Sequence, residues 1–318
     1  MFTKALSAGA VALTLTLGGC ALTANSPGEV YGAGGSEGVL DGARVTIASK
    51  AFTEQLILCE ITAQRLESQG ASVNRVCGMT GSNTVRAAEV SGNVDMSWEY
   101  TGTGWLTHLG EQEVITDPEE QYTKVRDEDL ERNQIVWLPP MPANSTYAVA
   151  VKTETAARMG LETLSDYANL VRSDPNAARF CGAAEFLGRD DGWPGLQQAY
   201  EFSLPRNDIA ELADGAIYNA VATNNPCTFG EVFATDGRIP ALGLTILTDD
   251  RHFFPVYNGS LTIRESILDE YPQIAPVMAP VSALLDDSTM RELNASVDAD
   301  GRTPDEVAGT WLHEHGLA

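Results

Sequence analysis

The sequence predicts an α/β fold built from two units, on three observations. Short alternating or apolar segments typical of strands take turns along the chain with segments of helical spacing. A second series of the same kind interrupts the first between residues 149 and 255. The chain from residue 45 onward is long enough for one large or two ordinary domains, and 43% of the whole sequence is hydrophobic. Such alternation is typical of mostly parallel sheets flanked by helices.

The first series opens with a strand, a short turn and a helix. Residues 45–48 alternate as a strand, and residues 53–69 carry apolar side chains at helical spacing until Gly70 ends them. The next expected elements are a strand at 72–77, a helix at 83–90, a strand at 94–98, a polar helix at 121–131 and a strand at 135–138.

The second series follows an alternating segment at 147–151. Its expected elements are helices at 164–171, 194–202 and 216–223 and strands at 179–181, 228–233 and 244–247. Residues 267–317 are mostly helical, and Pro304 opens the last helix. We therefore expect lobe 1 to hold residues 45–148 and 256–318, and lobe 2 to hold residues 149–255.

The N-terminal segment predicts an export signal followed by a tether. Lys4 precedes an apolar stretch, 5–17, that is too short to span a bilayer permanently, so residues 1–20 are expected to be a signal peptide. The segment Leu17-Gly18-Gly19-Cys20 resembles the lipobox of bacterial lipoproteins, which implies lipidation of Cys20 and anchoring to the cell membrane outside the cytoplasm. An ordinary signal peptide with an incidental cysteine is the alternative. Residues 21–44 are rich in small residues without apolar periodicity, as in a flexible tether.

The charge of the chain is strongly acidic. The formal net charge is −24, and it becomes −25 when Lys4 leaves with a signal that contains no Asp or Glu. Nucleic acid and anionic lipid headgroups are therefore poor partners. Solubility outside the cell accounts for most of this charge, with attraction of cationic ligands as a smaller contribution.

Four cysteines besides Cys20 predict two disulfides in an exported protein: Cys59, Cys77, Cys181 and Cys227. Sequence alone leaves three pairings open. We favour Cys59–Cys77 and Cys181–Cys227, because each pair then lies inside one expected lobe. No CxxC spacing occurs and the histidines lie far from the cysteines, so no metal site is expected.

Six segments resemble, in the same order, segments of the glycine betaine, carnitine and choline binding proteins of ABC transporters. They are SKAFTEQ (49–55), EYTGT (99–103), NSTYAVAV (144–151), EFLGRDDG (185–192), ATDGRI (234–239) and DDRHFFP (249–255). The resemblance implies a two-lobed type II periplasmic-binding-protein fold, with the ligand in the cleft between lobes that close by hinge motion. It also implies a monomeric binding subunit that works with a permease and its ATPase.

The resemblance further implies an aromatic cage. A trimethylammonium group has no N–H to donate, so the negative faces of aromatic rings must hold it. The residues that match the family's cage are Tyr100, Tyr147, Phe233 and Tyr257. The family commonly has tyrosine where this chain has Phe233, which keeps the ring face and loses the hydroxyl.

Ring contacts of ~0.5–2 kcal/mol each fall short of the about 8 kcal/mol that micromolar affinity needs, so the other end of the ligand must also be held. For a betaine that end is a carboxylate, and the matching candidates are Lys50, Thr103 and Arg189. Choline is expected to bind more weakly, because it would leave Arg189 unpaired.

The sequence leaves other ligands and other functions open at this point. Choline, carnitine or ectoine suit the same fold, and a receptor lipoprotein without a role in uptake is a further alternative. An enzyme is the main rival function of another class, but the chain contains no HExxH or P-loop motif. Its one GxSxG string, residues 34–38, lies in the expected tether and not between a strand and a helix, so it does not predict a nucleophile elbow. We expect no catalytic residues and no cofactor.

Overall fold

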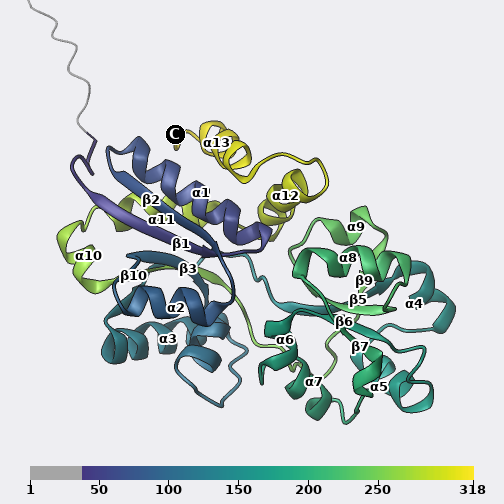
Figure 1. Ribbon diagram of the computed structural model, residues 1–318. Helices are drawn as coiled ribbons and strands as arrows, with labels where there is room; N and C mark the ends of the chain where they lie inside the picture. Colours follow the sequence, from purple (N-terminus) through teal and green to yellow (C-terminus); the bar gives the residue numbers. More distant parts are fainter. Residues whose placement is uncertain (1–37) are drawn as a thin grey trace, which may run out of the picture. The chain divides into compact units, whose positions relative to one another are not determined.

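Two five-stranded sheets organise the protein in the computed structural model, which describes residues 38–318 (Figure 1). The expected signal peptide, the lipobox cysteine Cys20 and most of the expected tether lie outside these residues. The packed part of the chain begins before residue 45, since Leu40 and Ala43 are buried and the Leu40 amide donates to the Gln69 carbonyl.

The first sheet has the strand order β2-β1-β3-β10-β4. Its strands are β1 (Arg44–Lys50), β2 (Ser72–Met79), β3 (Met96–Tyr100), β4 (Ile135–Trp137) and β10 (Gly259–Arg264). β1 pairs in parallel with β2 and β3, whereas β10 pairs antiparallel with β3 and β4. Every strand of this sheet except β10 therefore runs in one direction.

Helices cover both faces of the first sheet. They are α1 (Thr53–Ser68), α2 (Ser82–Val90), α3 (Pro118–Asn133), α10 (Glu265–Glu270), α11 (Ile274–Leu284), α12 (Asp287–Asp298) and α13 (Pro304–Glu314). Alternation along β1 decides which face each side chain meets. Ile47 joins the main core with α1, while Ala48 packs with Val85 of α2 on the other side.

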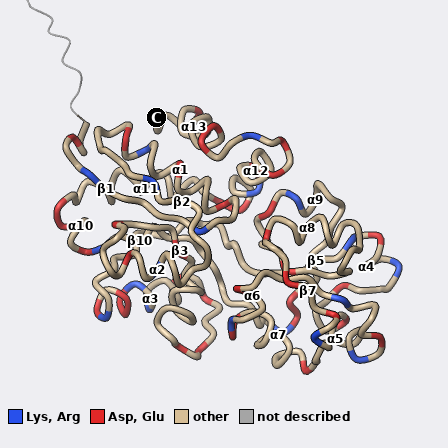
Figure 2. Tube along the Cα trace, in the orientation of Figure 1, with Lys and Arg blue, Asp and Glu red and all other residues tan. Residues whose placement is uncertain are grey.

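The second sheet has the order β7-β6-β8-β5-β9 and repeats this plan. Its strands are β5 (Tyr147–Lys152), β6 (Phe180–Gly182), β7 (Ile209–Glu211), β8 (Phe229–Phe233) and β9 (Leu244–Ile246), and its helices are α4 (Thr153–Met159), α5 (Leu164–Ser173), α6 (Ala184–Gly188), α7 (Trp193–Ala199), α8 (Asp214–Thr223) and α9 (Arg238–Ala241). β6 is parallel to β7 and β8, and β5 is antiparallel to β8 and β9. Asp and Glu are spread over both halves of the trace (Figure 2).

Both sheets are mixed, but four of the five strands in each run in one direction, in line with the mostly parallel sheets expected. The exceptions are β5 and β10, the strands that follow the two crossings between the sheets. The crossing segments run antiparallel beside each other, with a bridge between Asn144 and Asn258. Alternation of side chains is the same in parallel and antiparallel strands, so the sequence pattern does not report strand direction. The lobe boundaries at 148/149 and 255/256 stay a prediction.

One disulfide joins neighbouring elements in each half of the protein. Cys59 of α1 is bonded to Cys77 of β2, and Cys181 of β6 is bonded to Cys227 just before β8. This is the pairing favoured from the sequence. Between residues 38 and 318, no helix combines the length and the apolar character that a bilayer span needs.

Candidate ligand-binding site

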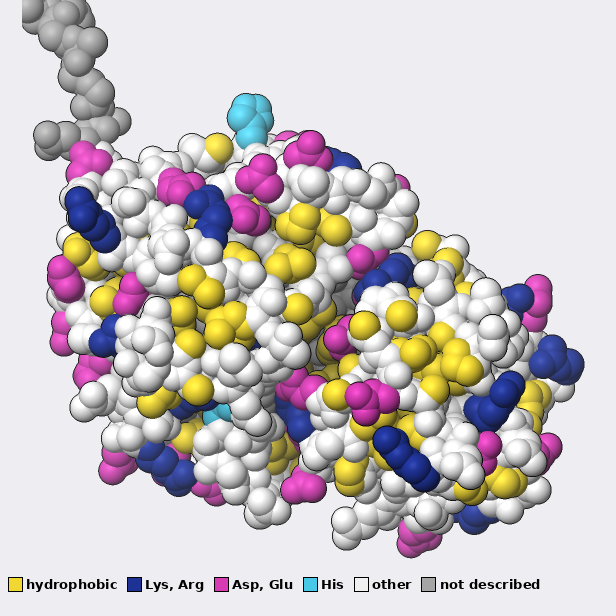
Figure 3. Space-filling model, viewed as in Figure 1, with side chains coloured by type: hydrophobic (Ala, Val, Ile, Leu, Met, Phe, Trp, Pro, Cys, Tyr) yellow, Lys and Arg dark blue, Asp and Glu magenta, His cyan; other side chains and the backbone are white. Residues whose placement is uncertain are grey.

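A cavity of about 850 Å³ opens between the two sheets, and the surface is hollowed there on the face shown in Figure 3. The seven side chains expected to contact a ligand all line it: Lys50, Tyr100, Thr103, Tyr147, Arg189, Phe233 and Tyr257. Their role as ligand contacts stays a prediction, but the fold brings them all to one place.

Strand direction explains why residues so far apart in sequence meet here. Lys50, Tyr100 and Phe233 end β1, β3 and β8, and ligands of α/β proteins bind at the carboxyl ends of such strands. β5 runs the opposite way, so its first residue, Tyr147, lies at the same edge as Phe233, its partner in register. Tyr257 belongs to the second crossing segment, just before β10.

Five aromatic rings form a continuous cluster along the cavity wall. The ring centroid of Tyr147 lies 5.5 Å from those of both Phe233 and Tyr257. Phe52 stacks on Phe233 at 4.8 Å and lies 6.3 Å from Tyr100. We call these five rings the ring cluster. The sequence analysis did not predict Phe52 as a cage residue, although it stands in the matched segment SKAFTEQ. The match to the family's cage had assigned only three tyrosines and Phe233.

Hydrogen bonds fix two of these rings. The Tyr100 hydroxyl donates to Glu54 Oε1 at 2.7 Å, and the Tyr257 hydroxyl donates to Asp191 Oδ2 at 2.6 Å. Burial, followed by the neighbouring carboxylate, raises the pKa of each phenol well above its usual value. Both hydroxyls therefore stay protonated and keep donating at physiological pH, which holds the rings in place.

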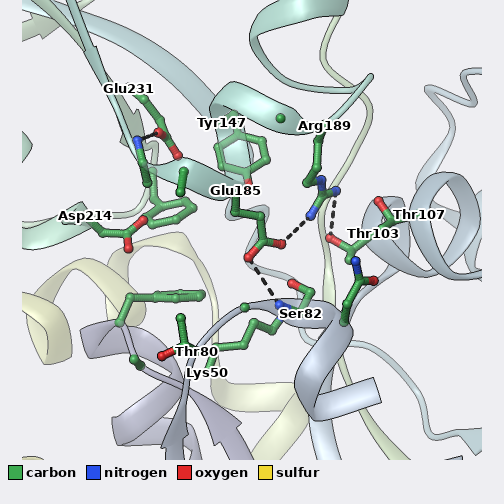
Figure 4. A pocket seen from close by; sticks show the side chains of 18 of the residues that line it. Lys50, Thr80, Ser82, Thr103, Thr107, Tyr147, Glu185, Arg189, Asp214 and Glu231 are labelled. Carbon is green, nitrogen blue, oxygen red and sulfur yellow. Dashed lines mark hydrogen bonds and ion pairs between the residues drawn. The ribbon is translucent and has the colours of Figure 1, made fainter. Parts of the chain in front are cut away.

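Arg189 is paired by its own chain. Its Nη1 donates to Glu185 Oε1 at 2.9 Å and its Nη2 to Thr103 Oγ1 at 3.3 Å (Figure 4). Its Nε donates to Asp191 Oδ1 at 2.7 Å. The expectation that a ligand without a carboxylate would leave this arginine unpaired is therefore wrong. Both acids stand in the same matched segment as the arginine, 185–192, but the sequence did not show that they pair with it.

Lys50 is also neutralised within the protein. Its Nζ donates to Glu99 Oε1 at 2.5 Å and lies 4.6 Å from the centre of the Tyr100 ring. Burial alone would raise the pKa of Glu99, but Lys50 and then His108 lower it below its usual range. Lys50 and Glu99 thus form a buried ion pair at the base of the cavity.

Four acidic side chains line the cavity and were not anticipated: Glu185, Glu211, Asp214 and Glu231. Lys50 and Arg189 are the only basic residues of that lining. Glu231 lies two residues before Phe233 on β8, so strand alternation was a signal that both side chains share a face. Burial, followed by the charge of Asp214, raises the pKa of Glu231 well above its usual value. Among residues 38–318 no cluster of three or more His, Cys, Asp or Glu side chains is arranged to bind a metal.

Comparison with known proteins agrees with this architecture. The crystal structure of a glycine betaine/carnitine/choline ABC transporter superposes with a TM-score of 0.69 at 25% identity, over 86% of this chain and 99% of that one. Apo YehZ from Escherichia coli gives a TM-score of 0.64 at 33% identity, with the same coverage. The expected two-lobed type II binding-protein fold is thereby confirmed.

Sequence relatives point the same way. The glycine-betaine-binding protein of Pseudomonas aeruginosa is 36% identical over 285 residues, which are 88% of this chain and 90% of that protein. The family model for the substrate binding domain of the ABC-type glycine betaine transport system matches residues 43–314. Since that match spans nearly all of the described residues, the chain belongs to this family of ABC-transporter substrate-binding domains.

Proposed function

We propose that this protein captures a small quaternary-ammonium compound in the ring cluster and delivers it to an ABC importer. The observation that carries the proposal is the set of five contiguous rings in one cavity. A methylated ammonium has no proton to share, so ring faces attract it where hydrogen-bond acceptors cannot bond to it. The names of the relatives support glycine betaine as the first ligand to test.

The remaining assignments belong to the same proposal. Tyr100, Tyr147, Phe233 and Tyr257 contact the ammonium together with Phe52, while Lys50, Thr103 and Arg189 shape the other end of the site. The protein acts as a monomer without catalysis, anchored through Cys20 and the tether outside the cytoplasm, and docks on a permease with its ATPase. The lipobox supports the anchor, and the transport family supports the absence of catalysis.

Calorimetric titration with glycine betaine, proline betaine, choline, carnitine and ectoine tests the proposal. Tyr147→Ala removes the central ring and should weaken the best ligand about tenfold or more, because a well-desolvated ring contact contributes ~1–2 kcal/mol. Tyr147→Phe is the matched control, since it keeps the ring face and should change the affinity by less than about threefold.

Two results would contradict the proposal. One is the absence of binding by every quaternary-ammonium compound in the panel, and the other is an unchanged affinity in Tyr147→Ala. Proton NMR of the bound ligand over a day separates binding from turnover, because a binding protein returns the ligand unaltered.

A further inference from the structure

We propose that the cavity contains a second, acidic subsite beside the ring cluster, formed by Glu231, Asp214 and Glu185. This subsite takes a hydrogen-bond-donating or cationic group at the other end of the ligand. The inference rests on the proposed function, since it assigns the second end of the same molecule.

The geometry of β8 places the subsite within reach of the cage. Glu231 and Phe233 are two residues apart on the strand, so their side chains share a face and lie about 7 Å apart along it. Phe233 stands opposite Tyr147 in register, and Glu231 stands opposite Val149, one repeat further along the strand. An ammonium on the rings and a donor two or three bonds away therefore fit between these positions.

Glu231 has an unused acceptor in the cavity. The residue is only 2% exposed, and its Oε2 accepts a hydrogen bond of 2.8 Å from the Ala183 amide (Figure 4). Its Oε1 receives no hydrogen bond from any residue between 38 and 318, although Glu231 lines the cavity. This oxygen is open to the cavity, so a donor on the ligand can form a charge-assisted hydrogen bond with it.

Asp214 and Glu185 add negative charge to the same wall. Asp214 lies in the first turn of α8 and Glu185 in α6, and both side chains line the cavity (Figure 4). Burial raises the pKa of Asp214, and the charge of Glu185 raises it further. Ionised carboxylates that repel one another attract a cation placed between them.

The groups that would hold a ligand carboxylate are already occupied. Glu185 Oε2 accepts from the Ser82 amide at the start of α2, at 3.2 Å, and Glu185 Oε1 accepts from Arg189. Glu185 thus occupies the position beside Arg189 that the carboxylate of a ligand would take. Asp191 and Glu99 neutralise Arg189 and Lys50 further. A carboxylate ligand must displace Glu185, whereas a donor or cation finds a free acceptor.

The volume of the cavity leaves room for this second group. About 850 Å³ is within the range of roughly 300–1,000 Å³ typical of sites for drug-sized ligands, and far more than a trimethylammonium group fills. A ligand with two recognised ends therefore suits the site better than a headgroup alone.

Four probes separate the two ends of the site in calorimetric titrations of the mature protein near pH 8. Tetramethylammonium offers only the cage group, choline adds a hydroxyl, (2-aminoethyl)trimethylammonium adds a protonatable amine, and glycine betaine adds a carboxylate. We expect the aminoethyl probe to bind at least about tenfold more tightly than tetramethylammonium, with choline between them.

Glu231→Gln tests the residue itself. The glutamine oxygen still accepts from the Ala183 amide, but the negative charge is gone. The affinity ratio, that of the aminoethyl probe over that of tetramethylammonium, should therefore fall to about twofold. Glu162→Gln removes the same charge from an exposed position outside the cavity lining and should leave the ratio unchanged. Asp214→Asn is the second variant if Glu231→Gln does not fold.

The outcomes distinguish the two proposals. If no probe binds, the proposed function fails. If tetramethylammonium binds but the aminoethyl probe gains nothing, or if Glu231→Gln and Asp214→Asn both leave the ratio unchanged, the acidic subsite is overturned and the cage remains. If glycine betaine binds more tightly than the aminoethyl probe and loses affinity as the pH rises, Glu231 acts as a neutral donor to a carboxylate, which also overturns the subsite.

Discussion

Arg189 shows how much a single side chain can set the charge of a cavity. Its guanidinium lies between Asp191 and Glu185 of its own lobe and reaches Thr103 of the other. Its side chain is 10% exposed, and that of Asp191 is 5% exposed. Removing the arginine would therefore leave acids without a cation as well as take away a potential ligand contact.

Arg189→Ala should consequently affect charged ligands in opposite ways. Glycine betaine should lose at least about tenfold in affinity, because its carboxylate meets unpaired acids, whereas choline should change by less than about threefold or bind more tightly. Titration calorimetry of both ligands checks this, with the exposed Arg158→Ala as control. Equal losses for the two ligands would show that the arginine acts only through the fold.

The pH dependence of binding follows from Glu231. The groups that face it are Asp214, Glu185, Arg189 and the Ala183 amide, and burial together with Asp214 raises its pKa. A cation beside Glu231 favours the ionised form, so affinity for the aminoethyl probe should rise with pH through that pKa and protons should be released on binding. Titrations in buffers of different ionisation enthalpy measure the released protons. Proton uptake, or none in wild type, would contradict this assignment.

Helix α2 carries another buried carboxyl group whose pKa is raised, and this group affects the stability of the fold. Its Glu89 is 1% exposed and accepts hydrogen bonds of 3.1 Å from Ser97 of β3 and Thr262 of β10. Burial raises the pKa of Glu89 to about 7. A carboxyl that the folded state holds protonated favours folding below its unfolded pKa, and this contribution is lost as the pH rises through the folded value.

Stability should therefore fall between about pH 4.5 and pH 7 because of this one group. Glu89→Gln mimics the protonated side chain and should remove that slope, leaving the variant more stable than wild type at pH 8 by up to about 3 kcal/mol. Urea unfolding at several pH values measures the effect, and the exposed Glu131→Gln is the control. The same slope in Glu89→Gln and wild type would place the titrating group elsewhere.

Most elements could be predicted from the sequence, including the three-residue strands β4, β6 and β9, whereas β7 and β10 were missed. Apolar spacing revealed α1, α5 and α8, because each carries buried apolar side chains at helical spacing. β7 has three residues and no fully buried position, so its sequence shows no apolar run. The π-helical turn η1 (Thr103–His108) was missed because tertiary packing shapes it: a Cβ on Gly104 would lie 2.5 Å from the Trp137 ring.

The site was predicted to a similar extent. Four of its five rings were found in or beside the matched segments, but Phe52 and the acids were not. An acid in a strand is usually solvated, and only the fold shows that Glu231 is buried.

One buried carboxylate connects the whole molecule. Glu54 of α1 accepts hydrogen bonds from the hydroxyls of Tyr100 at 2.7 Å, Ser145 at 2.6 Å and Thr235 at 2.8 Å, and from Asn294 Nδ2 at 3.2 Å. These partners come from β3, the first crossing segment, the loop after β8, and α12. The ring cluster and the crossing between the sheets thus share a single acceptor.

Glu54→Ala should therefore lower global stability and ligand affinity together. Each buried donor that loses its acceptor costs ~1–3 kcal/mol, so the free energy of unfolding should fall by at least about 2 kcal/mol. Denaturant unfolding with and without ligand measures both effects, and the exposed Glu119→Ala is the control. A loss of affinity without loss of stability would restrict Glu54 to holding the Tyr100 ring.

The place of β10 in the first sheet also sets the order in which the two sheets can form as the chain emerges N-terminus first. β10 lies between β3 and β4, yet the whole second sheet precedes it in the chain. In a chain that ends before Gly259, β4 has no strand to pair with, because its neighbour in the sheet is β10. The edge of β3 that pairs with β10 is also still open. The strands of the second sheet, by contrast, are all synthesised by Ile246. The half of the protein that is begun last is therefore the first whose sheet can be completed.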